Sequence, residues 1–195
     1  MIDPYCYPNS DILKNKMGIK DSTELDKVEV EFACNAIYEL SITPLAGEYD
    51  FVHLCNFHLF IFRDLYDWAG KPRTCNIAKT NLFCLAQYID TYAKDVFDEI
   101  NKNNYYIDLN YEKKIIVLAE LFADINALHP FREGNGRTQR EFINALAKIN
   151  GLKFDFTEVT ELEMIIASSE STSGDMGKLL NMFKKLQDRF LKKNN

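Results

Sequence analysis

A long helical pattern that stops at a proline dominates the middle of this chain. Residues 111–128 read YEKKIIVLAELFADINAL, and their apolar side chains recur every three or four positions, as on one face of a helix. Pro130 disfavours helical geometry at His129, so we expect the helix to end there. A second helix is predicted over about residues 135–150, with Gly151 as its C-terminal stop. The sequence therefore predicts two helices joined by a short polar loop.

The N-terminal part of the chain predicts two further helices. Asp21 or Ser22 can cap a helix whose apolar residues recur at helical spacing over residues 25–40. Residues 50–68 are long enough for a second helix and lead into a turn at 69–72, which contains Gly and Pro.

One segment departs from the helical pattern. Residues 73–83, RTCNIAKTNLF, are short and partly β-branched, so we predict a small β-hairpin flap over 72–84. A helix follows over about residues 84–101, and Thr157 and Ser173 are plausible caps for two closing helices. The predicted fold class is all-α: a helical bundle with one small β-hairpin.

Composition favours a single globular domain over residues 1–195, opening with an irregular arm at 1–20. Apolar residues make up 47% of the 195, enough to bury a sizeable core. A formal net charge of −6 argues against direct nucleic-acid binding, which needs a basic surface. A basic run at 184–193 is more typical of a solvated helix face than of a partner patch.

The cysteines and the N-terminus indicate a cytosolic protein that does not enter a membrane. The five cysteines are scattered and form no C-x-x-C pair, which is typical of reduced thiols. The first residues, MIDPYCYPNSD, are polar and broken by prolines, unlike a signal peptide. No apolar run approaches the roughly 18 residues of a membrane span. His53 and His58 are five apart, a poor spacing for a helical metal site, so core or surface positions are expected.

The polar loop between the two central helices, HPFREGNGRTQR at 129–140, has the composition of an anion site. A loop that leads into a helix N-terminus presents unpaired backbone N–H groups, and glycines let a ligand approach them. The helix dipole adds roughly half a positive charge at the same point. This arrangement suits phosphate.

The side chains of the loop also favour a phosphate site. Arg137 and Arg140 are three apart and can reach one polyphosphate, while Glu133 beside the phosphates makes sense if it binds a divalent cation such as Mg²⁺. His129 can accept a proton near neutral pH, and Phe131 can anchor the loop in the core. Each feature alone also fits a capping histidine, an ordinary turn or surface arginines. Together, within twelve residues, they favour a nucleotide site.

The same twelve residues resemble, position for position, the signature of the Fic family, H-P-F-x-[D/E]-G-N-G-R-x-x-R. The stretches DPYCYPNSDILKNKMGI and FRDLYDWAGKPRT are also similar to bacterial Fic proteins of the cell-filamentation type. The resemblance implies a helical Fic fold and the transfer of AMP from ATP to a Tyr, Thr or Ser hydroxyl of a target protein. Relatives that transfer other phosphate-containing groups or act as kinases, and a catalytically idle binding module, remain alternatives.

The resemblance also implies roles for individual residues. His129 would be the general base, Glu133 would hold Mg²⁺ and Phe131 would be the buried anchor. The implied ATP-binding residues are Gly134, Asn135, Gly136, Arg137 and Arg140, the last of which meets the γ-phosphate. A flap would pair with the backbone of the target protein by strand addition. Its residues are Cys75, Asn76, Ile77, Ala78 and Lys79.

Many Fic proteins carry an inhibitory helix with the pattern [S/T]-x-x-x-E-[G/N], and no segment here fits it. Among the glutamates, only Glu133, inside the loop itself, precedes Gly or Asn. The nearest imitations, residues 157–162 and 171–175, fail at the last position or lack the Glu. The resemblance therefore points to toxin-like Fic proteins whose inhibitory helix comes from a separate small antitoxin. A degenerate internal helix is the alternative.

Overall fold

The protein folds into a bundle of α-helices. A computed structural model describes residues 3–78 and 83–194, and this part of the chain contains seven α-helices. They are α1 (Ser22–Ile42), α2 (Phe51–Phe62), α3 (Ile89–Lys102), α4 (Tyr111–Leu128), α5 (Asn135–Ile149), α6 (Glu161–Thr172) and α7 (Gly177–Asn194). The predicted all-α class is confirmed. In the N-terminal arm, an isolated β-bridge joins Cys6 and Leu13.

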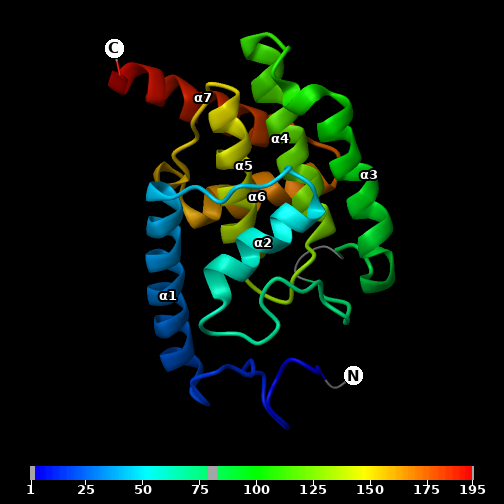
Figure 1. Cartoon of the computed structure of the whole chain (residues 1–195), viewed down its shortest axis with the longest axis vertical. Helices are drawn as coiled ribbons and strands as arrows, with labels where there is room; N and C mark the ends of the chain where they lie inside the picture. Colours follow the sequence, from blue (N-terminus) through cyan, green and yellow to red (C-terminus); the bar gives the residue numbers. More distant parts are fainter. Residues whose placement is uncertain (1–2, 79–82, 195) are drawn as a thin grey trace.

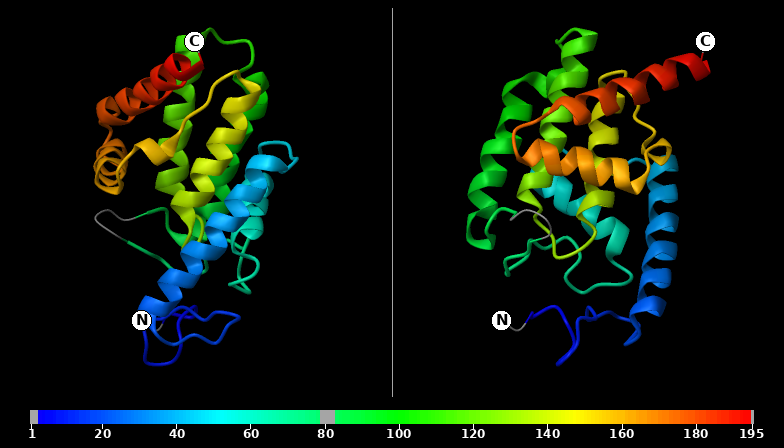
Figure 2. Two further views of the ribbon diagram at one scale, coloured as in Figure 1. Left: turned by 90° about the vertical axis from the view of Figure 1, so that its left-hand side faces the viewer. Right: turned by 180° about the vertical axis from the view of Figure 1, so that it is seen from behind.

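The helices form three layers, and the α4–α5 pair is the middle one (Figures 1 and 2). Helix α2 packs on α5 and α1 packs on α2, while α6 and α7 pack on the opposite side of α4. Helix α3 lies along α4. The chain starts at one end of the long axis and finishes at the other, and the α4–α5 loop lies toward the N-terminal end (Figure 1).

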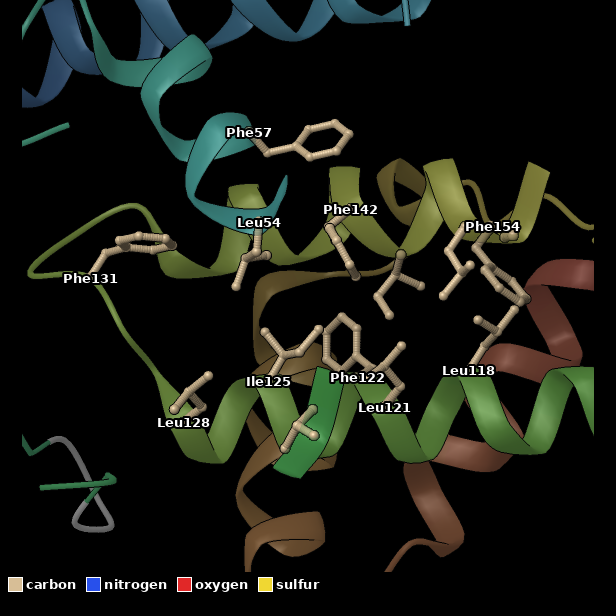
Figure 3. Packing of buried hydrophobic residues seen from close by; sticks show 14 of the residues in the cluster. Leu54, Phe57, Leu118, Leu121, Phe122, Ile125, Leu128, Phe131, Phe142 and Phe154 are labelled. Atoms are coloured by element: carbon tan, nitrogen blue, oxygen red, sulfur yellow. The ribbon is translucent and has the colours of Figure 1, made fainter. Parts of the chain in front are cut away.

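Aromatic side chains fill the space between the layers (Figure 3). Phe142 of α5 is fully buried, and its ring lies 6.0 Å from that of Phe57 in α2 and 5.6 Å from that of Phe97 in α3. On the other side of the central pair, Phe122 of α4 meets Phe183 of α7 with their ring centroids 5.5 Å apart. Burying a side chain of this size contributes about 1.5–3 kcal/mol, so these contacts hold the three layers together.

Where capping and periodicity act locally, the predicted helix limits are confirmed. Asp21 caps α1, with its carboxylate accepting from the Glu24 N–H at 2.8 Å. Helix α4 spans the predicted residues, and its N-terminus is capped by Asn110. Helix α5 begins at Asn135 as predicted.

The prediction of one helix over 50–68 was wrong, because α2 ends at Phe62. From there the chain makes turns and folds back, and the Gly70 N–H donates to His58 Nδ1 at 2.8 Å. Gly70 has a left-handed φ of 76°, and a Cβ there would lie 2.8 Å from the Leu59 Cβ. A tertiary contact with α2 itself therefore replaces the last helical turns.

The predicted starts of three other helices also differ from the structure. The helix predicted over 84–101 starts later, since the Cys84 N–H donates to the Ala127 carbonyl at 2.9 Å and keeps that end extended. Thr157 belongs to a short 3-10 turn, and the α6 cap is Thr160. Ser173 ends α6 instead of starting α7. The hairpin over 72–84 remains a prediction, because residues 79–82 lie outside the described ranges.

The described part of the chain contains no helix with the length and apolarity that crossing a bilayer requires. The basic run at 184–193 lies along the exposed side of α7. Two of its members, Arg189 and Lys193, pair with Glu158 of the 3-10 turn before α6. Two members of the run therefore link α7 to that turn through exposed ion pairs, and the basic side chains of the run face solvent.

Candidate active site

The loop from His129 to Gly134 turns the chain from α4 into α5 (Figure 3). His129 is the C-cap of α4 and adopts a left-handed conformation with φ 44° and ψ 59°. Gly134 is the N-cap of α5 with φ 78°, and a Cβ there would lie 2.3 Å from the Phe62 ring. Only glycine fits at that point, so α2 and α5 can approach closely beneath the loop.

The start of α5 offers backbone N–H groups to a ligand. The first intrahelical bond runs from the Thr138 N–H to the Gly134 carbonyl at 3.1 Å, so the N–H groups of 135–137 have no intrahelical acceptor. The Asn135 side chain is buried and bridges both backbone groups of Phe131, accepting at 2.8 Å and donating at 2.7 Å. Asn135 therefore closes the loop with its side chain and offers an anion only its backbone N–H.

A buried histidine that sequence reasoning left without a role supports the loop from below. His58 of α2 stacks on Phe131 with ring centroids 3.9 Å apart. Because its Nδ1 accepts from Gly70, its Nε2 carries the proton and donates to the Glu133 carbonyl at 3.0 Å. Burial lowers the pKa of His58 to about 3, so the ring is neutral. No local pattern in the sequence signals this contact.

His129 lies at the mouth of the loop with 9% of its surface exposed. Its Nδ1 is 3.3 Å from the Asn126 carbonyl, an acceptor, so Nδ1 carries the proton and Nε2 can accept one. The ring stacks on Phe83 with centroids 3.7 Å apart and planes 12° apart. The geometry thus gives the imidazole a fixed orientation and the tautomer that a general base requires.

The two predicted arginines have different surroundings. Arg137 pairs with Glu29 of α1, and its Nη2 also lies 3.8 Å from the Glu133 carboxylate. Arg140 is partly buried, and burial together with the charge of Arg137 lowers its pKa. Within residues 3–78 and 83–194, no carboxylate forms an ion pair with Arg140. Glu141 attracts Arg140 only from beyond ion-pair distance, and a partly buried guanidinium group with no carboxylate in contact favours binding of an anion.

Glu133 fits a role as a cation ligand that depends on a bound nucleotide. Its Oε1 accepts from the Gly134 N–H at 2.8 Å, and 39% of the side chain is exposed. The described residues contain no group of three or more His, Cys, Asp or Glu side chains that could hold a metal ion. Mg²⁺ typically takes one or two carboxylates and completes its shell with phosphates and water, so one carboxylate beside a phosphate site suffices.

The predicted flap begins next to the loop. Of its five predicted residues, 75–78 are described and Lys79 lies outside the described ranges. The Asn76 side chain accepts from the Ala86 N–H at 2.8 Å, which joins the two ends of the segment. Arg73, just before it, donates to the carbonyls of Cys75 and His129 at 2.8 Å and 2.9 Å. The base of the flap is therefore tied to the loop.

The N-terminal arm also reaches the site, which the sequence did not indicate. Asp3 pairs with Arg132 of the loop, with Oδ2 and Nε 2.7 Å apart. The Tyr5 hydroxyl accepts from the Thr74 N–H at 3.0 Å, beside the base of the flap. The arm thus contacts both the loop and the flap segment.

The fold and the loop together define a class of all-helical proteins with a histidine-bearing, glycine-containing loop that leads into a helix N-terminus with free N–H groups. Residues 48–147, just over half of the chain, match the Fic/DOC family. This protein belongs to the Fic/DOC family. The match covers α2 to α5, the helices that position the loop, and it excludes α1 with Glu29.

Relatives and solved structures agree with that assignment. Protein adenylyltransferase VbhT of Bartonella schoenbuchensis is 38% identical over 174 residues, which are 89% of this chain but only 36% of VbhT. Probable protein adenylyltransferase y4lH of Sinorhizobium fredii is 36% identical over 180 residues, covering 91% of this chain and 92% of that protein. The N-terminal Fic domain of a putative cell filamentation protein from Bartonella quintana, crystallised with ADP, is 27% identical with a TM-score of 0.89 and covers 93% of each chain.

Proposed function

We propose that this protein is a protein adenylyltransferase, which transfers AMP from ATP to a hydroxyl side chain of a target protein. The observation that carries the proposal is the junction at the start of α5. The N–H groups of 135–137 have no intrahelical acceptor, Arg140 belongs to the first two turns of the same helix, and the loop that enters this helix carries an imidazole in the general-base tautomer. The relatives named as adenylyltransferases and the ADP in the Bartonella quintana structure support the same activity.

The proposed reaction is a single displacement at the α-phosphorus of ATP. The target hydroxyl gives its proton to His129 Nε2 while its oxygen forms a bond to the α-phosphorus of ATP. The bond from that phosphorus to the bridging oxygen breaks on the opposite side, and pyrophosphate leaves. The negative charge that grows on the leaving group meets the N–H groups of 135–137 and the Arg140 guanidinium. Fixed donors of this kind stabilise the transition state without having to reorganise.

Glu133 and Arg137 complete the site. Glu133 would hold Mg²⁺, which when bound neutralises charge between the phosphates. Arg137 pairs with Glu29 and lies next to Glu133. It would keep the Glu133 carboxylate at the mouth of the phosphate site and add positive charge there. Gly136 keeps the approach open, because a Cβ there would lie 3.3 Å from Arg140 Nη1.

The target protein and a regulator would meet the site from outside. Residues 75–79 would pair with the target backbone next to the modified hydroxyl. Inhibition would come in trans, from a small antitoxin whose glutamate forms an ion pair with Arg140. No carboxylate within the described residues forms that ion pair. The chain would act as a single catalytic domain in the bacterial cytoplasm, where its five free cysteines stay reduced.

A label-transfer assay tests the proposal. ATP labelled at the α-phosphate is incubated with a bacterial lysate and either the wild-type protein or His129→Ala. We expect a labelled protein band with the wild type and a loss of at least about 100-fold with the variant. Label transferred only from the γ-phosphate would mean kinase chemistry, and no transfer from either position would mean a binding module. Labelling is also compared with and without a co-expressed small protein from a neighbouring gene; unchanged labelling would contradict inhibition in trans.

A further inference from the structure

Arg73 joins three parts of the site through one side chain. It is 2% exposed and lies in the segment after the α2 turn. Its Nε donates to the His129 carbonyl at 2.9 Å, its Nη1 to the Cys75 carbonyl at 2.8 Å, and its Nη2 to the Cys84 carbonyl. Its own backbone N–H donates to the Pro130 carbonyl at 2.8 Å. The loop and both ends of the flap segment therefore meet at a single guanidinium group.

The chemistry of these contacts requires arginine. A guanidinium group is planar and always charged, and it presents donors in several fixed directions, whereas a lysine ammonium is a compact point charge. Within the described residues no carboxylate pairs with Arg73, so its charge is met by carbonyl oxygens. Burying a charge without a counter-ion is costly, and an apolar side chain of similar size would fill the space without that cost. Unlike an apolar side chain, the guanidinium group can hold three carbonyl groups in place by donating a hydrogen bond to each of them.

Arg73 also stabilises an unfavourable backbone conformation. The left-handed conformation of His129 costs about 1–2 kcal/mol in a non-glycine residue. The carbonyls of His129 and of the next residue, Pro130, both accept hydrogen bonds from Arg73. These bonds fix the peptide group that directly follows His129 and the next one along the loop, and so restrict the backbone that carries the imidazole.

We propose that Arg73 is a positioning residue, which holds the His129 imidazole and the two described ends of the flap, at Cys75 and Cys84, at a fixed distance from each other. The inference rests on the proposed adenylyl transfer. In that reaction, a target backbone paired with the flap must place its hydroxyl at His129 Nε2. An arginine that sets both positions at once couples target docking to proton removal. Nucleotide binding, by contrast, depends on residues 134–140 and does not involve Arg73.

The test compares Arg73→Lys with Arg63→Lys, an exposed control at the end of α2. Initial rates of α-label transfer to the lysate band are measured together with the affinity for ADP. We expect Arg73→Lys to slow transfer by about 100-fold, as a small misplacement of reacting groups does, while ADP affinity stays within about twofold. The control should match the wild type in both. A parallel loss of transfer and ADP affinity would mean that the whole site has collapsed, and would overturn the proposal.

A readout independent of activity separates this inference from the proposed function. Diethyl pyrocarbonate modifies accessible histidines, and the other two, His53 and His58, are sealed in the core. Arg73→Lys should speed the modification of His129 because its loop is no longer held. This holds even if the wild type transfers no AMP, which would overturn only the proposed function. An unchanged modification rate with wild-type transfer would overturn the role of Arg73.

A measurement on the wild-type protein covers the case in which Arg73→Lys does not fold. In nuclear magnetic resonance spectra, the Arg73 Nε–H should exchange slowly with solvent, since it is buried and bonded to the His129 carbonyl. An Nε–H that exchanges as fast as that of the exposed Arg63 would contradict the proposal.

Discussion

At the scale of single residues, His58 shows how burial fixes the chemistry of a side chain. Both ring nitrogens have defined partners, the Gly70 N–H and the Glu133 carbonyl, and the ring stacks on the loop anchor Phe131. The pKa of about 3 means that the native protein keeps His58 neutral through the acidic range. The site therefore rests on a histidine that takes no part in proton transfer.

Because burial keeps His58 neutral, we expect the free energy of unfolding to depend on pH. In the unfolded chain His58 takes up a proton near pH 6.5, whereas in the native protein it does so only near pH 3. The contribution of His58 is therefore complete above pH 6.5 and is lost as the pH falls toward 3. The slope is up to about 1.4 kcal/mol per pH unit between those values.

Urea unfolding between pH 4 and pH 8 measures this slope. His58→Gln keeps an amide donor and acceptor but cannot titrate, so its free energy of unfolding should fall less steeply below pH 6.5 than that of the wild type. The difference between the two proteins isolates His58 from the carboxylates, which titrate in both. Identical slopes would show that His58 is not held neutral.

At the scale of elements, the start of α6 shows how capping sets a helix limit. The Thr160 hydroxyl accepts from the Glu163 N–H at 3.2 Å, and the Glu163 carboxylate accepts from the Thr160 N–H at 3.0 Å. This capping box satisfies two N–H groups reciprocally. Thr157, the predicted cap, instead bonds to the Asp155 carboxylate within the preceding turn.

The two threonines therefore differ in their contribution to stability. Thr160→Ala removes a helix cap and should lower the free energy of unfolding by about 1 kcal/mol. Thr157→Ala removes an exposed contact in a turn and should change it by less than about 0.5 kcal/mol. Urea unfolding of both variants at neutral pH gives the comparison. The reverse order would show that the helix starts at the earlier threonine.

At the scale of the whole molecule, Phe142 lies where three helices meet. Its ring contacts Phe57 of α2 and Phe97 of α3, and it comes from the helix whose first turn follows the loop. The Tyr49 ring, just before α2, lies 6.0 Å away. The packing that orients α5 therefore also places the loop.

Phe142→Ala should destabilise the whole fold. Removal of a fully buried phenylalanine leaves a cavity and costs about 3–5 kcal/mol. Leu162→Ala, at a side chain that is 67% exposed on α6, is the matched control and should change stability by less than about 0.5 kcal/mol. Thermal and urea unfolding measure both. A small effect of Phe142→Ala would mean that the layers hold together without this core.

The sequence by itself determined the elements whose causes are local. Periodic apolar residues and Pro130 predicted α4 and its end, and the glycine-rich loop predicted the start of α5. The residues of the loop could also be named as candidates, because each interaction involves groups within twelve positions of one another. These signals are short-range, so a linear sequence displays them.

Only the tertiary structure decided which distant residues support the loop. Arg73 reaches His129 across 56 positions, His58 reaches Glu133 across 75, and Glu29 reaches Arg137 across 108. In the sequence each of these side chains has an ordinary neighbourhood, typical of a surface arginine, a core histidine or a solvated helix face. Their hydrogen bonds depend on the distance between groups in space, which the packing of the helices sets and the order of residues does not show.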